Sequence, residues 1–371
     1  MTRHSRFWRE SLILPSPSQC VWLWNYSRNS AMNPSLKQFK GEYQTLLLDF
    51  LWRQWSALGV AGQTQVANDW IIDPEALLLL TCTVGRAEAR LFDEMLDWLQ
   101  VNGWLINVMR LKRILRTEKF AAVHESVLAA IAGWLAKGAE APKWKLLAVS
   151  APPPAAAEPL FFSEDGQAIP ALGEPEPLFA RYGWQRGPLR LRGYSQEFRP
   201  AEAATLALQL RALLGINVRC EIVMYLLTHD AAHPSQIARE AYYSERAVQG
   251  TLADMSRSGV VQLRAASREK HYWLKPDQWL PLLNRGGQPA PKWIAWPPLF
   301  SALEQIWLRL RDTKLHDLES LLQASEARQL MSTVRPALER AGFDRTLSDD
   351  RQHLGESYLP VFMADVKQLL T

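Results

Sequence analysis

The stretch between residues 216 and 275 constrains the fold more than any other part of this 371-residue chain. Its apolar residues recur at helical spacing in three successive segments and then give way to two short β-rich runs, which predicts three helices followed by a hairpin. Ser244 stands at the N-cap position of the third helix, and Gly259 suits its C-terminal cap. The helices are expected at Val218–Leu227, from Pro234 onward and at Glu245–Arg257, and the strands at 260–264 and 271–274.

This order of elements resembles the winged helix-turn-helix domain of bacterial transcriptional regulators of the MarR and ArsR type. The resemblance covers about residues 201–285 and rests on the element order, the segment IAREAYYSERAVQGTLADM and the basic hairpin. It implies a mainly α fold class, in which a central domain of three helices and a β-hairpin wing lies between N-terminal and C-terminal helical regions. It also implies a sequence-specific double-stranded DNA-binding protein, a repressor acting as a homodimer, with helix 201–214 helping to dimerise.

The predicted DNA contacts follow from which side of helix 245–257 is buried. With Val248, Leu252 and Met255 inward, Arg246 and Gln249 face outward, and these side chains suit guanine and adenine edges in the major groove. Cations of the hairpin are expected either along phosphates or in the minor groove. The predicted DNA-binding residues are Ser235, Ser244, Glu245, Arg246, Gln249, Arg257, Arg264, Arg268, Lys270 and His271.

The charge of this region is modest, which leaves a second interpretation open. Residues 201–288 hold ten Lys and Arg against eight Asp and Glu, a net charge of +2, whereas DNA-binding domains are usually more basic. Winged helices also serve as protein-docking modules. The alternative function is therefore a protein-interaction subunit that binds an operon-encoded enzyme, as in toxin–antitoxin or defence systems, with or without autoregulation.

A second basic stretch lies between residues 102 and 119. An Asn-Gly turn precedes a basic helix, so a degenerate helix-turn-helix is one interpretation, and its outward face would be Asn107, Arg110, Arg113 and Arg116. The other interpretation is a basic face packed against an acidic neighbour. Residues 40–100 supply such a neighbour, with nine acidic residues against four basic ones.

Composition shifts divide the chain into five parts. Residues 1–34 read as an extension, faintly like a signal sequence but without a convincing cleavage site. Residues 294–371 carry nine bases and eleven acids, which favours oligomerisation or partner binding over DNA binding. The other expected parts are an all-helical domain at 35–145, a Pro/Ala-rich linker with a basic segment at 146–200, the winged domain at 201–288 and a helical region at 289–371.

The sequence offers little chemistry. His229 and His233 flank a turn rather than share a helix, and Asp349, Asp350 and His353 have the same loop character, so no metal site is expected. The chain has no Gly-rich phosphate loop and no run of about 18 apolar residues. Its three cysteines lack metal-ligand spacing and fit a reducing compartment. We therefore expect a cytoplasmic protein that is no enzyme, has no cofactor and does not span a membrane.

Overall fold

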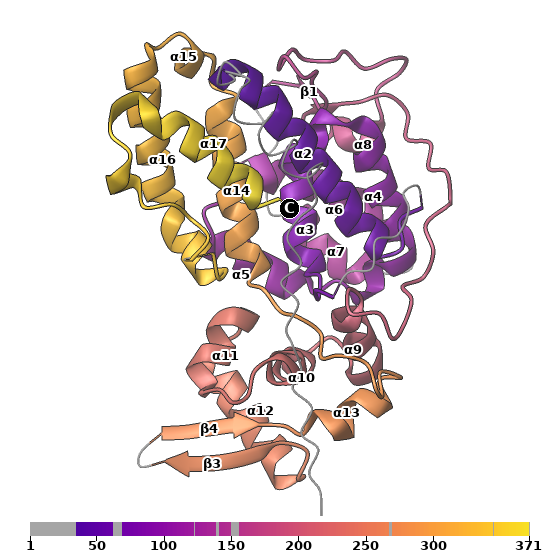
Figure 1. The fold of residues 1–371 in the computed structure, drawn as a ribbon. Coiled ribbons are helices and arrows are strands. Elements are labelled where there is room, and N and C mark those ends of the chain that lie inside the picture. Colours follow the sequence, from indigo (N-terminus) through magenta and orange to yellow (C-terminus); the bar gives the residue numbers. More distant parts are fainter. Residues whose placement is uncertain are drawn as a thin grey trace, which may run out of the picture. The chain divides into compact units, whose positions relative to one another are not determined.

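The part of the chain described by the computed structural model is mainly helical, as the sequence predicts (Figure 1). It comprises residues 35–61, 69–121, 123–138, 141–149, 156–266, 269–343 and 345–370, so the expected extension at 1–34 lies outside it. Within this range, no helix combines the length and the apolarity that crossing a membrane requires.

The N-terminal helices surround α3 (Pro74–Val84), every residue of which is buried. Asp73 begins this helix by accepting the N–H of Ala76, and Pro74 occupies the first turn, where its missing N–H costs nothing. The apolar run that follows packs on all sides, as expected of a central helix. Around it lie α2 (Leu36–Ala57), α4 (Ala89–Asn102), α5 (Val108–Thr117), α6 (Val123–Leu135) and α7 (Ala141–Ala148), with 3₁₀ turns at Gly85–Ala87 and Gly103–Leu105.

The C-terminal helices belong to the same apolar core as the N-terminal ones. Tyr43 of α2 donates its hydroxyl to the carbonyl of Leu303 at 3.0 Å, and Phe50 packs edge-on against Phe300. We refer to residues 36–205 and 294–370 together as the helical body. Its C-terminal elements are α14 (Trp296–Leu310), α15 (Thr313–His316), α16 (Ser320–Arg340), α17 (Tyr358–Gln368) and the 3₁₀ turns Asp350–Gln352 and Gly355–Ser357.

The segment 156–205 follows the surface of the helical body instead of standing free. The carboxylate of Asp97 on α4 accepts the backbone N–H groups of Gly193 and Ser195, at 3.1 and 2.9 Å. The basic residue Arg186 is buried and pairs with Asp93 at 2.8 Å. The segment forms β1 (Glu158–Pro159) and β2 (Trp184–Gln185), which pair in parallel, and the short helix α8 (Pro177–Ala180).

Residues 206–283 have a second apolar core of their own and are called the hairpin module below. The three helices lie at the predicted residues, and Gly259 has φ +80° after the third helix. An antiparallel hairpin follows, but its expected bounds of 260–264 and 271–274 are wrong, because backbone pairing continues as far as Ala266 opposite Glu269. Arg264 lies opposite His271 in this register. The elements are α9 (Leu206–Leu214), α10 (Val218–Thr228), α11 (Pro234–Ala241), α12 (Glu245–Arg257), β3 (Gln262–Ala266), β4 (Glu269–Trp273) and α13 (Pro276–Leu282).

Helix α9 connects the two cores. Leu206 and Leu210 are fully buried in the hairpin module, while Leu208 belongs to the core of the helical body. Leu213 is the exposed large apolar residue of this helix, at 51%. The apolar faces that were expected to help dimerise are therefore used within the chain.

Candidate nucleic-acid interface

Helix α12 has one buried face and one open face. Ser244 begins the helix, because its hydroxyl oxygen accepts the N–H of Ala247 at 3.3 Å. Val248 and Leu252 are fully buried and Met255 nearly so. Because helical side chains three and four apart share a face, this burial turns the remaining residues toward solvent.

The open face carries the two predicted base-reading side chains. Arg246 is exposed and has no hydrogen bond or ion pair to any residue that the structure describes. Gln249 is also exposed, and its amide donates to Glu245 at 2.8 Å. A Cβ added at Gly250 would meet nothing within 4 Å, so this side of the helix is low and open. Toward the end of the helix, Arg257 pairs with Asp254 at 3.0 Å while remaining 79% exposed.

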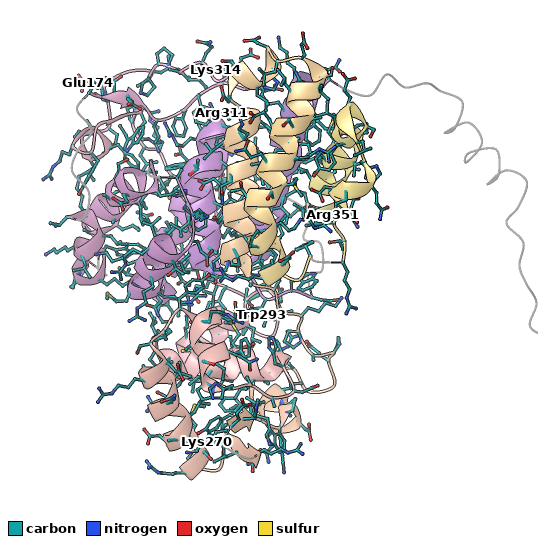
Figure 2. All side chains as sticks on the ribbon, turned by 90° about the vertical axis from the view of Figure 1, so that its left-hand side faces the viewer. Glu174, Lys270, Trp293, Arg311, Lys314 and Arg351 are labelled. Carbon is teal, nitrogen blue, oxygen red and sulfur yellow. The ribbon has the colours of Figure 1, made fainter. Side chains whose placement is uncertain are left out.

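The hairpin extends the open surface with further cations. Arg264 on β3 and Lys270 on β4 are exposed, and Lys270 lies at the outer end of the hairpin module in Figure 2. His271 is half-buried, 3.3 Å from Glu269. Ser235, at the start of α11, is exposed and bonds His233 at 2.7 Å. The predicted contact Arg268 lies outside the described residues.

The charge of this surface is nearly balanced. Between residues 244 and 277 the described cations are five and the described acids four, a net charge of +1, and all nine are exposed. The cations are Arg246, Arg257, Arg264, Lys270 and Lys275, and the acids are Glu245, Asp254, Glu269 and Asp277.

The second predicted face, on α5, is turned inward at its start. Asn107 and Arg110 were expected to point outward, and this expectation is wrong, because they are 6% and 3% exposed. Asn107 caps α5 by accepting the N–H of Arg110, and its amide donates to the Tyr243 hydroxyl at 2.7 Å. Arg113 is half-buried and donates to the carbonyl of Tyr242, whereas Arg116 is exposed.

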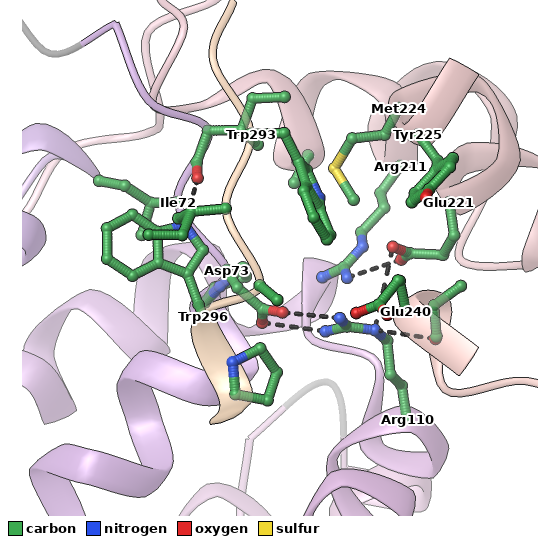
Figure 3. A pocket seen from close by; sticks show the side chains of 17 residues that line it. Ile72, Asp73, Arg110, Arg211, Glu221, Met224, Tyr225, Glu240, Trp293 and Trp296 are labelled. Carbon is green, nitrogen blue, oxygen red and sulfur yellow. Dashed lines mark hydrogen bonds and ion pairs between the residues drawn. The ribbon is translucent and has the colours of Figure 1, made fainter. Parts of the chain in front are cut away.

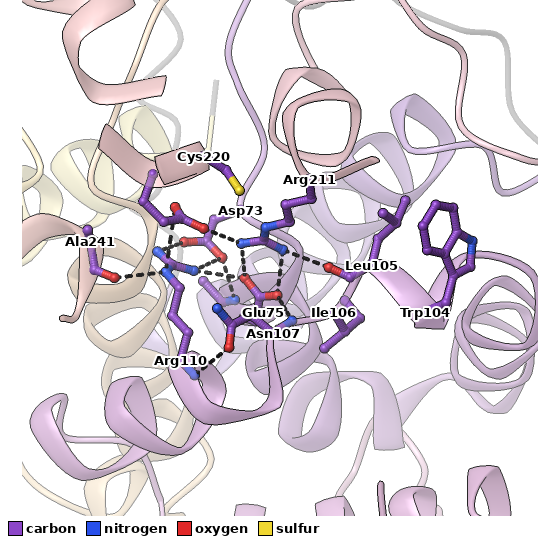
Figure 4. A network of polar contacts seen from close by, with 12 residues as sticks. Asp73, Glu75, Trp104, Leu105, Ile106, Asn107, Arg110, Arg211, Cys220 and Ala241 are labelled. Carbon is purple, nitrogen blue, oxygen red and sulfur yellow. Dashed lines mark hydrogen bonds and ion pairs between the residues drawn. The ribbon is translucent and has the colours of Figure 1, made fainter. Parts of the chain in front are cut away.

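Arg110 is buried because it belongs to an ion-pair network between the helical body and the hairpin module (Figure 4). Its guanidinium contacts Asp73 at 2.6 Å and Glu75 at 2.8 Å, and its Nε donates to the carbonyl of Ala241 at 3.2 Å. The acidic partners Asp73 and Glu75 come from the acid-rich region 40–100, so the other interpretation is correct about the acidic neighbour of Arg110. Arg110 is nevertheless buried against this neighbour and does not belong to a solvated face.

Arg211 of α9 forms the second half of this network. It contacts Glu75 at 2.6 Å and Glu221 of α10 at 2.8 Å. Burial alone would lower the pKa of both arginines, but the surrounding carboxylates outweigh it and raise the pKa of Arg110 and of Arg211. Burial likewise favours protonated Asp73, yet the ion pair with Arg110 lowers the pKa of this carboxyl below 3.8. Arg110, Arg211 and Asp73 are therefore charged at neutral pH.

The turn between α11 and α12 also contacts the helical body. Tyr242 has a left-handed backbone, φ +59°, and ends α11 as its C-cap. Its hydroxyl donates to Glu118, which also pairs with Arg340 of α16 at 3.1 Å. Arg113 lies over the Tyr243 ring, 4.8 Å from its centroid. Sequence reasoning missed this contact, since Glu118 is one acidic residue in the basic stretch 102–119 and no local pattern indicates its partners.

The histidines that were considered as metal ligands in the sequence make local contacts in the structure. His229 stacks on Tyr225, with ring centroids 3.8 Å apart, and His233 caps α11. Among the residues that the structure describes, no three His, Cys, Asp or Glu side chains are placed to hold a metal ion. Comparison of the chain with known protein families, with curated proteins and with solved structures finds no match.

Proposed function

We propose that this protein is a sequence-specific double-stranded DNA-binding protein, a cytoplasmic repressor, in which the hairpin module acts as a winged helix-turn-helix domain. In this proposal α11 and α12 are the helix-turn-helix, α12 is the recognition helix, and β3–β4 is the wing. The observation that carries it is the open face of α12, where Arg246 and Gln249 are exposed while the opposite face of the same helix is buried.

The proposed contacts with DNA follow from the donor and acceptor groups of the exposed side chains. In the major groove Arg246 would donate to O6 and N7 of guanine, and Gln249 would pair with N6 and N7 of adenine. To make this contact, the Gln249 amide would release its hydrogen bond to Glu245. The freed carboxylate of Glu245 could then accept from the N4 amino group of cytosine. Gly250 permits close approach of the backbone, and Arg264 and Lys270 would neutralise phosphates beside the groove.

A homodimer forms part of the proposal, because two modules would read two half-sites about 34–36 Å apart. Since α9 is largely buried within the chain, the dimer would use another surface.

Selection of bound fragments from genomic DNA, followed by titration against the selected and a shuffled duplex, tests this function. Arg246→Ala and Gln249→Ala should each cost about 1–3 kcal/mol on the selected sequence and little on the shuffled one. Lys270→Ala should weaken both duplexes similarly. Lys314→Ala is the matched control, since this exposed lysine lies at the opposite end of the described structure in Figure 2. Equal affinity of the unmutated protein for both duplexes would refute the proposal.

The second candidate is the interaction subunit, favoured by a tryptophan-lined hollow on the helical body. Trp104 is 44% exposed there, and the hollow of about 750 Å³ also includes Trp134 and Trp144. Aromatic residues are enriched at the centres of protein interfaces. Co-purification from native extract, repeated with Trp104→Ala, tests it: a specific protein lost with this variant but kept with Lys314→Ala supports a partner, and recovery of the chain alone argues against one.

A further inference from the structure

A small cavity of about 20 Å³ lies beside the ion-pair network, between the helical body and the hairpin module (Figure 3). A volume of this size holds about one water-sized group. Asp73, Glu221 and Glu240 reach it from three different elements, together with the guanidinium groups of Arg110 and Arg211. Trp293, which precedes α14, and Trp296, the first residue of α14, line its other side. The cavity is thus small, polar on one side and aromatic on the other.

The network beside this cavity lacks one positive charge. Three buried carboxyl groups, those of Asp73, Glu75 and Glu221, share the two guanidinium groups of Arg110 and Arg211, which is a formal net charge of −1 when every group carries its ordinary charge. A buried charge without compensation is strongly destabilising.

Glu240 adds a further carboxylate whose charge is already balanced. Its Oε1 accepts from the exposed Arg239 at 2.7 Å. Its Oε2 is buried and has no hydrogen-bond partner among the described residues, and the same holds for Oε2 of Glu221. The two residues are 8% and 2% exposed. Nε of Arg110 lies 3.9 Å from the free oxygen of Glu221, which is too far for a hydrogen bond.

The free oxygens and the aromatic rings meet in one place. Figure 3 shows the carboxylates of Glu221 and Glu240 on one side of the cavity and the indole of Trp293 across from them. Tyr225 lies beside Trp293, with ring centroids 5.5 Å apart. Ring faces attract cations, most strongly where water is excluded. A bridging water would satisfy the free oxygens but would leave the missing charge unsupplied.

We propose that this cavity binds a primary ammonium group, either the ammonium ion or the head of a small alkylamine. Its N–H groups would donate to Oε2 of Glu221 and Oε2 of Glu240, and its charge would bring the network to neutrality. The partly exposed Trp293 and Met224 form the outer wall, along which a carbon substituent would leave. Two free carboxylate oxygens suit such a group better than Ca²⁺, which takes six to eight oxygen ligands.

The bound cation would join α10 to α11 beside Ala241, the residue that Arg110 holds. It would therefore stabilise the hairpin module itself, next to the contact of Ala241 with Arg110 of the helical body. Cation binding at this cavity does not require DNA binding, so the experiment below can fail without affecting the proposed function.

Thermal unfolding of the full chain in ammonium, methylammonium and tetramethylammonium chloride at equal ionic strength tests the proposal. Ammonium and methylammonium, at about tenfold excess over Kd, should raise Tm by roughly 2 °C relative to tetramethylammonium, which has no N–H group and is too large for the cavity. Glu240→Gln and Glu221→Gln should each remove this difference, because each replaces a carboxylate that the ammonium contacts. Glu319→Gln, at an exposed glutamate of the helical body, should keep it.

The same Tm in all three salts for the unmutated protein would overturn the proposal, since a proton or a water molecule would then satisfy the free oxygens of Glu221 and Glu240. A difference that persists in both glutamine variants would also overturn it, because it would reflect a general effect of the salts. If one variant does not fold, the other variant and the comparison of salts on the unmutated chain still decide.

Discussion

Replacement of Arg110 by methionine should destabilise the protein by about 3–5 kcal/mol, because it leaves buried carboxylates without their cation. Arg110 is 3% exposed and lies within 2.8 Å of both Asp73 and Glu75. Methionine keeps most of the aliphatic volume, so the expected loss is mainly electrostatic. In the variant, Arg211 alone would face three carboxylates, and the net charge of the network would change from −1 to −2.

The expected loss of stability has two contributions. Breaking a buried ion pair by removing one partner costs about 3–5 kcal/mol, and this figure includes the uncompensated charge. The carbonyl of Ala241 also loses its donor at 3.2 Å, which moves the expected loss toward the upper end of this range if water does not reach it. Asp73→Asn keeps an N-cap residue before α3 while removing one negative charge. The double variant should therefore lose less stability than the sum of the two single variants.

Urea unfolding followed by far-ultraviolet circular dichroism measures this loss. Arg116→Met is the matched control, because Arg116 lies on the same helix and is exposed. This control should change the free energy of unfolding by less than about 0.5 kcal/mol. Equal losses for Arg110→Met and Arg116→Met, or strictly additive losses with Asp73→Asn, would refute the electrostatic explanation.

Two further perturbations test other contacts of the hairpin module. Tyr242→Phe removes the hydroxyl that donates to the buried Glu118 and should cost about 1–3 kcal/mol in urea unfolding, whereas an unchanged midpoint would contradict this contact. Burial lowers the pKa of His229 below 6.5, so the unfolded chain binds the proton more readily. The stability from neutral His229 is therefore fully present above about pH 6.5 and is lost as pH falls through the folded-state pKa. His229→Phe, which can keep the stacking on Tyr225, should flatten this slope in unfolding measured from pH 7.5 downward.

Local signals in the sequence predicted the elements that depend on local contacts. Asp73 followed by Pro74 predicted the start of α3, and Ser244 predicted the start of α12, because an N-cap hydrogen bond spans about three residues. The hairpin was equally visible as two β-rich runs around a polar loop. The three predicted helices of the hairpin module follow from the same short-range pattern.

Contacts between residues far apart in the chain determine which side chains of α5 are buried, and the local sequence pattern does not indicate them. Helix α5 has a basic face in any reading, but periodicity does not tell which partner covers it. Arg110 meets Asp73 and Glu75 from the preceding region and Ala241 from more than a hundred residues further along the chain. The sequence held only a coarse sign of this outcome, the excess of acids in residues 40–100.

The segment 156–205 illustrates a second limit. It has few regular elements, and its backbone is held by side chains of α4, such as Asp97 and Asn102. Contacts of this kind leave no hydropathy period, so the segment reads as a linker in the sequence. The apolar core shared by the N-terminal and C-terminal helices is similarly absent from any local pattern, because it joins residues such as Tyr43 and Leu303.

The inward position of Arg110 limits how the protein can bind DNA. Because α5 uses its first basic side chain to hold the hairpin module, phosphate contacts would come from the module itself. It offers five described exposed cations between residues 244 and 277, and Arg268 adds a sixth from the sequence. Each neutralised phosphate contributes about −0.9 to the slope of log K against log salt, so the six cations of α12, the hairpin and Lys275 should give a slope no steeper than about −5. Titration of a single half-site at several salt concentrations measures it, and a slope near −8 would mean that cations outside this surface, such as Arg219 and Arg239 of the module or Arg116 of α5, also reach the DNA.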